Sequence, residues 1–126
     1  SQFGMRGVRD QWMYPVAKAG LIQLPRSLAM SLSRHGVTCV ALVPGAFATE
    51  ATASLRELMP RSDRVPVGYF GCPESIGPAV VLLASEASEY LNGEILPIDG
   101  GVLAGGLAPT GYAPLMPWGP SDAGGR

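Results

Sequence analysis

Histidine, cysteine and long apolar runs are scarce in this chain of 126 residues, and each scarcity excludes a class of protein. The only histidine is His35, and neither Cys39 nor Cys72 has a metal-ligand neighbour, so we expect no metal site. The two cysteines lie far apart without a pairing pattern, which favours free thiols in a reducing, cytoplasmic setting. No apolar stretch approaches the ~20 residues that span a bilayer, so no membrane partner is expected.

Basic charge is scarce as well. Nine Lys and Arg residues against ten Asp and Glu residues give a formal net charge of -1. Without a basic patch or interleaved aromatic residues, we expect no nucleic-acid partner. The sequence opens with no charged-then-apolar leader, so no secretion signal is expected, although a first residue of Ser leaves open that the natural N-terminus lies upstream.

Apolar spacing predicts a long helix over 13–34. Five apolar residues recur three or four positions apart and form one stripe: Ala17, Leu21, Leu24, Leu28 and Leu32. Further apolar residues widen this surface: Val16, Ile22 and Ala29. Arg34 and His35 suit the negative end of the helix dipole, and Gly36 can adopt the left-handed cap. Pro25 is discordant, because a proline inside a helix removes a backbone hydrogen bond.

The rest of the chain alternates strand and helix. Residues 37–43 form an apolar run that suits a parallel strand covered on both faces, and it ends at a Pro44-Gly45 loop. A short helix is expected over 54–59, an irregular segment over 61–71 and a second helix over 73–85. After an Asn92-Gly93 turn, 94–98 is predicted to be an edge strand, because Pro97 cannot donate to a ladder. Residues 102–126 are expected to form an extended, Gly- and Pro-rich tail.

This order of elements predicts an α/β fold with a βαβ crossover. Two parallel strands are not stable alone, because a parallel sheet needs several neighbours and cover on both faces. We therefore expect a fragment of a doubly wound, three-layer parallel sheet.

Tyr14 and Lys18 are the candidate chemical pair. They lie four positions apart at the start of the long helix, so both side chains share one face. A free phenol, with a pKa of about 10, is a poor acid–base group at neutral pH. A neighbouring ammonium favours the phenolate and makes such a group more useful. The spacing alone leaves open a surface lysine beside a partly buried tyrosine.

Five motifs in order resemble the short-chain dehydrogenase/reductase family. They are Tyr14-Pro-Val-Ala-Lys18-Ala-Gly, Val43-Pro-Gly-Ala-Phe-Ala-Thr49-Glu, Gly71-Cys-Pro-Glu-Ser-Ile, Leu83-Ala-Ser-Glu-Ala-Ser and Leu91-Asn-Gly-Glu-Ile-Leu-Pro-Ile-Asp99-Gly-Gly101. The resemblance covers residues 1–101, which would be the C-terminal half of a Rossmann-like catalytic domain, with 102–126 as a tail outside it. It implies that the N-terminal, glycine-rich nucleotide-binding half is missing from this sequence.

The resemblance implies a catalytic role for three residues. Tyr14 would exchange a proton with the substrate oxygen while a hydride moves to or from the nicotinamide of NAD or NADP. Lys18 would favour the phenolate and hydrogen-bond the nicotinamide ribose. Ser1, thirteen residues before Tyr14, would polarise the substrate carbonyl, with a chance serine as the alternative.

A cofactor loop is implied in the same way. Pro44 and Gly45 match the family's loop beside the nicotinamide ring, and Phe47, through its backbone, and Thr49, through its hydroxyl, match positions that hold the carboxamide or a nearby phosphate. A loop at the carboxyl end of a parallel strand is where such sheets bind ligands. A later glycine cluster has the wrong spacing for a nucleotide-binding turn and is interpreted as a linker: Gly100, Gly101, Gly105 and Gly106.

The implied activity is the interconversion of a small-molecule alcohol and a carbonyl. The motifs look like those of gluconate-type sugar-acid dehydrogenases, with 3-oxoacyl reductases as the other implied class. The Tyr14–Lys18 spacing argues against the enoyl-reductase branch. The long helix resembles the family's dimer-packing helix, so a homodimer or homotetramer is expected, and 61–71 would belong to a substrate loop. The competing interpretation is a truncated, non-catalytic remnant that cannot bind cofactor alone.

Overall fold

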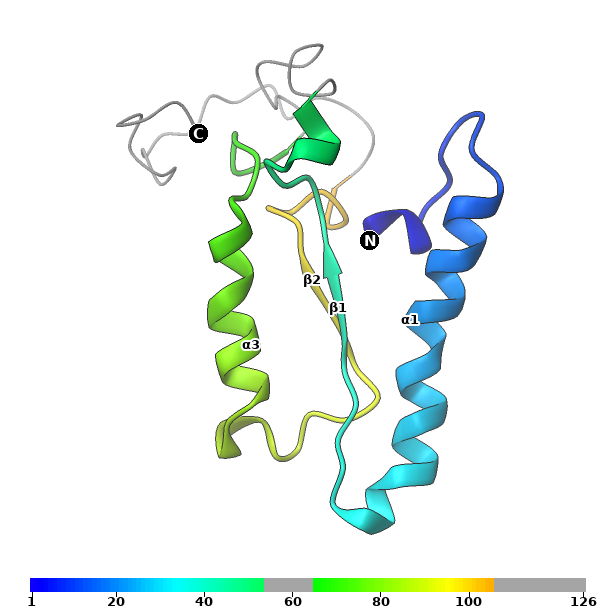
Figure 1. Ribbon diagram of the computed structural model, residues 1–126, viewed down its shortest axis with the longest axis vertical. Helices are drawn as coiled ribbons and strands as arrows, with labels where there is room; N and C mark the ends of the chain where they lie inside the picture. The colour runs from blue at the N-terminus through cyan, green and yellow to red at the C-terminus, as the bar shows by residue number, and fades with distance from the viewer. Residues whose placement is uncertain (54–64, 106–126) are drawn as a thin grey trace. The chain divides into compact units, whose positions relative to one another are not determined.

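The computed structural model describes residues 1–53 and 65–105 (Figure 1). The chain divides into two units. The first consists of Ser1–Pro44 and Gly77–Pro97, and the second of Gly45–Ile76 and Ile98–Arg126. The first unit contains the long helix and most of the sheet, whereas the second contains the loops that follow each strand.

Helix α1, Met13–Leu32, confirms the predicted long helix. It passes into the 3-10 turn η2, Ser33–His35, and ends at Gly36, whose φ of 72° is the predicted left-handed cap. Pro25 lies inside α1 without ending it. The local signals for this helix therefore located both its start and its end.

The face that α1 buries is one part of the predicted apolar surface. Its buried residues are Ile22 and Ala29, seven positions apart and hence on one face. Ile22 is covered by Gly4 of the short 3-10 turn η1, Gln2–Gly4, and Ala29 lies against Gly93. Much of the leucine stripe is exposed, with exposed fractions of 56% for Leu21 and 48% for Leu24. The spacing of the apolar residues predicted the helix, but it did not predict which of its apolar faces is buried by other described residues.

Strands β1, Ala41–Pro44, and β2, Ile95–Ile98, pair in a two-stranded sheet. Ala41 N donates to Glu94 O and Gly45 N donates to Ile98 O, each at 2.9 Å. Both partners advance by the same number of residues along the chain, so the strands are parallel. Ala41 and Val43 are buried, and Val43 has no exposed surface.

Strand β1 begins at Ala41, later than the predicted start at residue 37. Before Ala41, the side chain of Asn92 takes the place of a neighbouring strand as the partner of the backbone. Asn92 Oδ1 accepts a hydrogen bond from Cys39 N at 2.8 Å, and Asn92 Nδ2 donates to Ser33 Oγ at 2.8 Å. The Cys39 carbonyl accepts from Gly93 N at 2.7 Å. Asn92 thus ties the end of α1 to the approach to β1.

The segment between the strands completes the predicted βαβ unit. The 3-10 turn η4, Pro73–Ile76, leads into α3, Gly77–Leu83, which is followed by the 3-10 turn η5, Glu86–Ser88. The predicted helix over 73–85 is therefore confirmed, with a 3-10 first turn and a shorter α-helical part. Pro78 lies in the first turn of α3, where its missing N–H is not needed. In Figure 1, α1 and α3 lie on either side of the two strands.

The second unit is built around a bridge between two loops. Gly71 N donates to Ala46 O at 2.9 Å, and Ala48 N donates to Gly71 O at 2.7 Å. A 3-10 turn, η3, Glu50–Thr52, follows the first of these loops. Residues 65–70 are irregular, as predicted. The predicted helix over 54–59 and residues 61–64 of the irregular segment lie outside the described residues.

The interpretation of the late glycine cluster as a linker is wrong for Gly100 and Gly101. Their φ values are 63° and 89°, and they turn the chain after β2. A Cβ on Gly100 would lie 2.7 Å from side-chain atoms of Val65 and of Val67, so only glycine permits this contact. Val102 is buried, so the packed chain continues beyond residue 101. Residues 106–126 of the predicted tail lie outside the described residues.

Within the described ranges, none of the helices has both the length and the apolar character needed to cross a bilayer.

Candidate active site

The start of α1 brings Tyr14 and Lys18 into contact. One helical turn separates them, and the Lys18 ammonium lies over the Tyr14 ring, 5.4 Å from its centroid. The Tyr14 side chain is 46% exposed. Lys18, the only lysine in the sequence, is half-buried and forms no ion pair with any described residue. A half-buried ammonium beside an accessible phenol is therefore available to a ligand.

Ser1 lies beside this pair because η1 packs against α1. Gly4 permits the approach, since a Cβ there would lie 2.7 Å from the backbone carbonyl carbon and oxygen of Lys18. The Phe3 ring meets the Tyr14 ring edge-on, with centroids 6.4 Å apart. The three predicted catalytic residues thus belong to one cluster of the first unit.

The Ser1 hydroxyl keeps its proton free for a ligand. Its oxygen accepts a hydrogen bond from Phe3 N at 3.3 Å, which caps η1. Because a serine hydroxyl can donate one hydrogen bond while it accepts others, this cap leaves the O–H available for a carbonyl oxygen.

The loop after Pro44, the last residue of β1, holds Gly45, Phe47 and Thr49 in the second unit. A Cβ on Gly45 would lie 2.5 Å from Asp99 Cα, so the loop needs glycine at this position. Thr49 is exposed, and its hydroxyl lies 3.2 Å from that of Thr52. This loop therefore presents hydroxyl and backbone groups and no basic side chain among its described residues.

Two further residues that shape this loop were not found from the sequence. Thr52 Oγ1 donates to Phe47 O at 2.6 Å and accepts from Thr49 N at 2.9 Å. Asp99 accepts from Gly101 N at 2.8 Å and from Leu103 N at 2.7 Å, one bond to each carboxylate oxygen. The Asp-Gly-Gly sequence that follows β2 was the available signal for the turn held by Asp99, because aspartate side chains often accept hydrogen bonds from the backbone of a turn.

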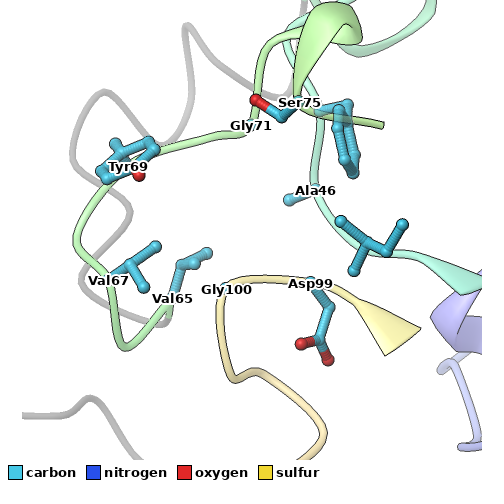
Figure 2. Close-up of a pocket in the computed structure, with 10 residues that line it drawn as sticks. Ala46, Val65, Val67, Tyr69, Gly71, Ser75, Asp99 and Gly100 are labelled. Atoms are coloured by element: carbon cyan, nitrogen blue, oxygen red, sulfur yellow. The ribbon is translucent and has the colours of Figure 1, made fainter. Parts of the chain in front are cut away.

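A cavity of about 160 Å3 lies within the second unit (Figure 2). Ala46 and Phe47 of the loop after β1 form one wall, and Val65, Val67 and Tyr69 form another. Asp99, Gly100 and Ile98 contribute the end of β2 and the turn after it. The predicted cofactor loop therefore also forms part of this cavity, which the sequence did not indicate.

Comparison with known proteins identifies the family. A family model described as Enoyl-(Acyl carrier protein) reductase matches residues 1–103. The 3-oxoacyl-[acyl-carrier-protein] reductase MabA of Mycobacterium avium is 39% identical over 101 residues, which cover 79% of this chain and 40% of that protein. The chain belongs to the short-chain dehydrogenase/reductase family. The resemblance inferred from the five motifs is thus confirmed.

Two other short-chain dehydrogenases/reductases are similar to it. The 2-dehydro-3-deoxy-D-gluconate 5-dehydrogenase of Escherichia coli is 38% identical over 95 residues, which cover 72% of this chain and 38% of that protein. A structure described as a 2-deoxy-D-gluconate 3-dehydrogenase from Agrobacterium tumefaciens, with bound NADP, has a TM-score of 0.78. It is 35% identical, and the match covers 83% of this chain and 44% of that one. The predicted Rossmann-like α/β fold is confirmed, and the chain spans about two fifths of these relatives' length, 40% in the case of MabA.

Proposed function

We propose that this chain carries the acid–base centre of an NAD(P)-dependent oxidoreductase that interconverts an alcohol and a carbonyl. The observation that carries the proposal is the Lys18 ammonium, 5.4 Å from the centroid of the Tyr14 ring. Family membership supports the reaction class, and the cluster at the start of α1 supports the assignment of the residues.

Tyr14 is the proton-transfer group of this proposal. In reduction its hydroxyl donates a proton to the substrate oxygen, and in oxidation the phenolate takes the proton from the alcohol. The positive charge of Lys18 stabilises the negative charge that develops on the Tyr14 oxygen. The Ser1 hydroxyl donates a hydrogen bond to the same substrate oxygen and polarises the carbonyl. The exposed fraction of Tyr14, 46%, leaves room for a substrate to reach it.

The residues present fit a nicotinamide cofactor, NAD or NADP. Lys18 has an ammonium without an ion-pair partner among the described residues, which suits the hydroxyls of a ribose. Thr49 presents an exposed hydroxyl that suits a carboxamide or a phosphate. We assign Phe47 through its backbone N–H, because its carbonyl already accepts a hydrogen bond from Thr52. Pro44 and Gly45 hold this loop at the carboxyl end of β1. When bound, the cofactor would supply or accept the hydride.

The relatives point to two substrate classes, 3-oxoacyl compounds and gluconate-type sugar acids. Both contain a carbonyl or an alcohol next to a carbon chain, so either suits proton transfer by Tyr14. The matching family model is described as an enoyl reductase. The three residues between Tyr14 and Lys18 argue for carbonyl over enoyl reduction in this chain.

Assembly as a homodimer or homotetramer is part of the proposal. The exposed leucines of α1 form an apolar surface that supports pairing with a second copy, with Leu21 at 56% and Leu24 at 48% exposure. We also place the protein in the cytoplasm, where Cys39 and Cys72 would persist as the free thiols that the structure shows.

The same apolar surface favours a competing proposal for the polypeptide as written. In this alternative the chain is a non-catalytic remnant that pairs or associates through α1 and binds no cofactor alone. It predicts that the polypeptide shows neither cofactor binding nor turnover, whatever residue stands at position 14.

The deciding experiment is Tyr14→Phe in the intact enzyme. We expect the catalytic constant for carbonyl reduction to fall by ~10²–10⁴, because general acid catalysis is lost. Binding of NADPH, followed by its fluorescence, should change little. Tyr90→Phe is the matched control, because Tyr90 is 98% exposed, and it should leave the catalytic constant unchanged. Full activity in Tyr14→Phe would refute the mechanism.

A further inference from the structure

The cavity of the second unit has an apolar lining. Phe47 and Val65 are buried, with exposed fractions of 8% and 6%, and Val67 and Ile98 add aliphatic surface. In Figure 2, Val65 and Val67 project from one wall toward the space that faces Ala46. At about 160 Å3 the cavity is as large as the dry apolar cavities that bind a benzene-sized molecule. A group of about six carbon atoms would therefore fill it.

Asp99 is the one charged side chain among the described residues of the lining, and its carboxylate is bonded to the turn after β2. Both of its carboxylate oxygens accept backbone hydrogen bonds, from Gly101 N and Leu103 N. Figure 2 shows the carboxylate on the side of the turn that follows β2, away from Val67 and Tyr69. Asp99 thus serves the turn, and it leaves the apolar part of the cavity without a competing charge.

The lining is poorly suited to a sugar acid. Among the described residues that line the cavity there is no lysine, arginine or histidine, so none of them would supply a cation to a carboxylate that loses water there. Among the described lining residues, Tyr69 and Ser75 alone have hydroxyl side chains. The several hydroxyls of a polyhydroxy acid would therefore lose water partners without replacing them.

We infer that this cavity binds an uncharged apolar group, namely the aliphatic part of a 3-oxoacyl substrate, in preference to a sugar acid. The inference deepens the proposed function and rests on it for the identity of the reaction. Its own basis is the size and the lining of the cavity. Ala46 and Phe47 link the cavity to the loop that we assign to the cofactor.

The test places a charge on the cavity wall by Val67→Lys. Val67 is 40% exposed, so the ammonium can reach water and the fold should tolerate it. In the intact enzyme with NADPH, we expect kcat/KM for ethyl 3-oxohexanoate, an uncharged ester, to fall by ~10-fold or more, a typical effect of a changed hydrophobic pocket. With the oxidised cofactor, kcat/KM for D-gluconate should stay the same or rise, because the new cation attracts its carboxylate.

The matched control is Val81→Lys on α3, where Val81 is 70% exposed and lies outside the cavity. It should leave both kcat/KM values unchanged. Wild-type preference for D-gluconate over the ester, or an unchanged kcat/KM for the ester in Val67→Lys, would overturn the inference.

Ligand-observed NMR with ethyl 3-oxohexanoate separates this inference from the proposed function. Binding to the wild-type enzyme that is weakened by Val67→Lys but not by Val81→Lys supports the cavity assignment even if no substrate is turned over. In that case the proposed oxidoreductase function fails while the site stands. Turnover of the ester with equal binding by all three proteins would retain the function and refute the site.

Discussion

In each of the two units a glycine lets two segments approach closely, but the two units present different chemical groups. In the first unit, Gly4 brings η1 against the backbone of Lys18, and in the second, Gly45 brings a loop against Asp99. The first unit then presents an ammonium and a phenol in contact, whereas the second presents hydroxyls and an apolar cavity. The difference teaches that the groups proposed to move a proton and those proposed to select a ligand lie in separate parts of the chain.

The sharpest test of this division is Lys18→Met in the intact enzyme. If the first unit carries the chemistry, the catalytic constant should fall by ~10²–10⁴, because the charge beside Tyr14 is lost. Arg9→Met is the control, since the Arg9 side chain is 95% exposed and, within the described part of the chain, forms its salt bridge with Asp10. Steady-state kinetics with ethyl 3-oxohexanoate would measure both. An equal loss in the two variants would contradict a specific role for Lys18.

The close approaches at the two glycines are tested by Gly4→Ala and Gly45→Ala. A Cβ at either position would meet backbone atoms at 2.5–2.7 Å, so we expect each change to destabilise the fold by about 1–3 kcal/mol. The free energy of unfolding from denaturant titration is the measurement. Gly20→Ala in α1 is the control: its Cβ would meet nothing within 4 Å, and alanine favours the helix by about 0.5–1 kcal/mol. Wild-type stability in Gly45→Ala would show that the loop does not need this close approach.

The smallest expected effect concerns Asn92, which belongs to the first unit alone. Asn92→Ala leaves Cys39 N without its partner and should cost about 1–2 kcal/mol of unfolding free energy. Asn92→Asp keeps an acceptor for Cys39 N but loses the donor to Ser33 Oγ, so it should cost less. Denaturant titration of the two variants compares the contributions of the two hydrogen bonds to the free energy of unfolding. Equal losses would mean that the bond to Ser33, rather than that to Cys39, carries the stability.

Local signals predicted much of the fold. The Gly36 cap, the start of α1 and the parallel pairing of the strands follow from residues close in sequence or from the general geometry of a βαβ unit. The start of β1 did not follow, because Cys39 is paired by a side chain 53 positions away. Which part of the apolar surface of α1 is buried did not follow either, because α1 has more than one apolar face and its neighbours decide which is covered.

The sequence alone determined that the two residues of the proposed acid–base pair lie together. Tyr14 and Lys18 lie one helical turn apart, and a helix places such side chains together whatever surrounds it. Only the tertiary structure decided what supports them and which cavity the second unit contains. Three features join segments that are distant in sequence: the packing of Gly4 against α1, that of Gly45 against Asp99, and the position of the valines around the cavity. Such contacts depend on how the chain packs rather than on local spacing.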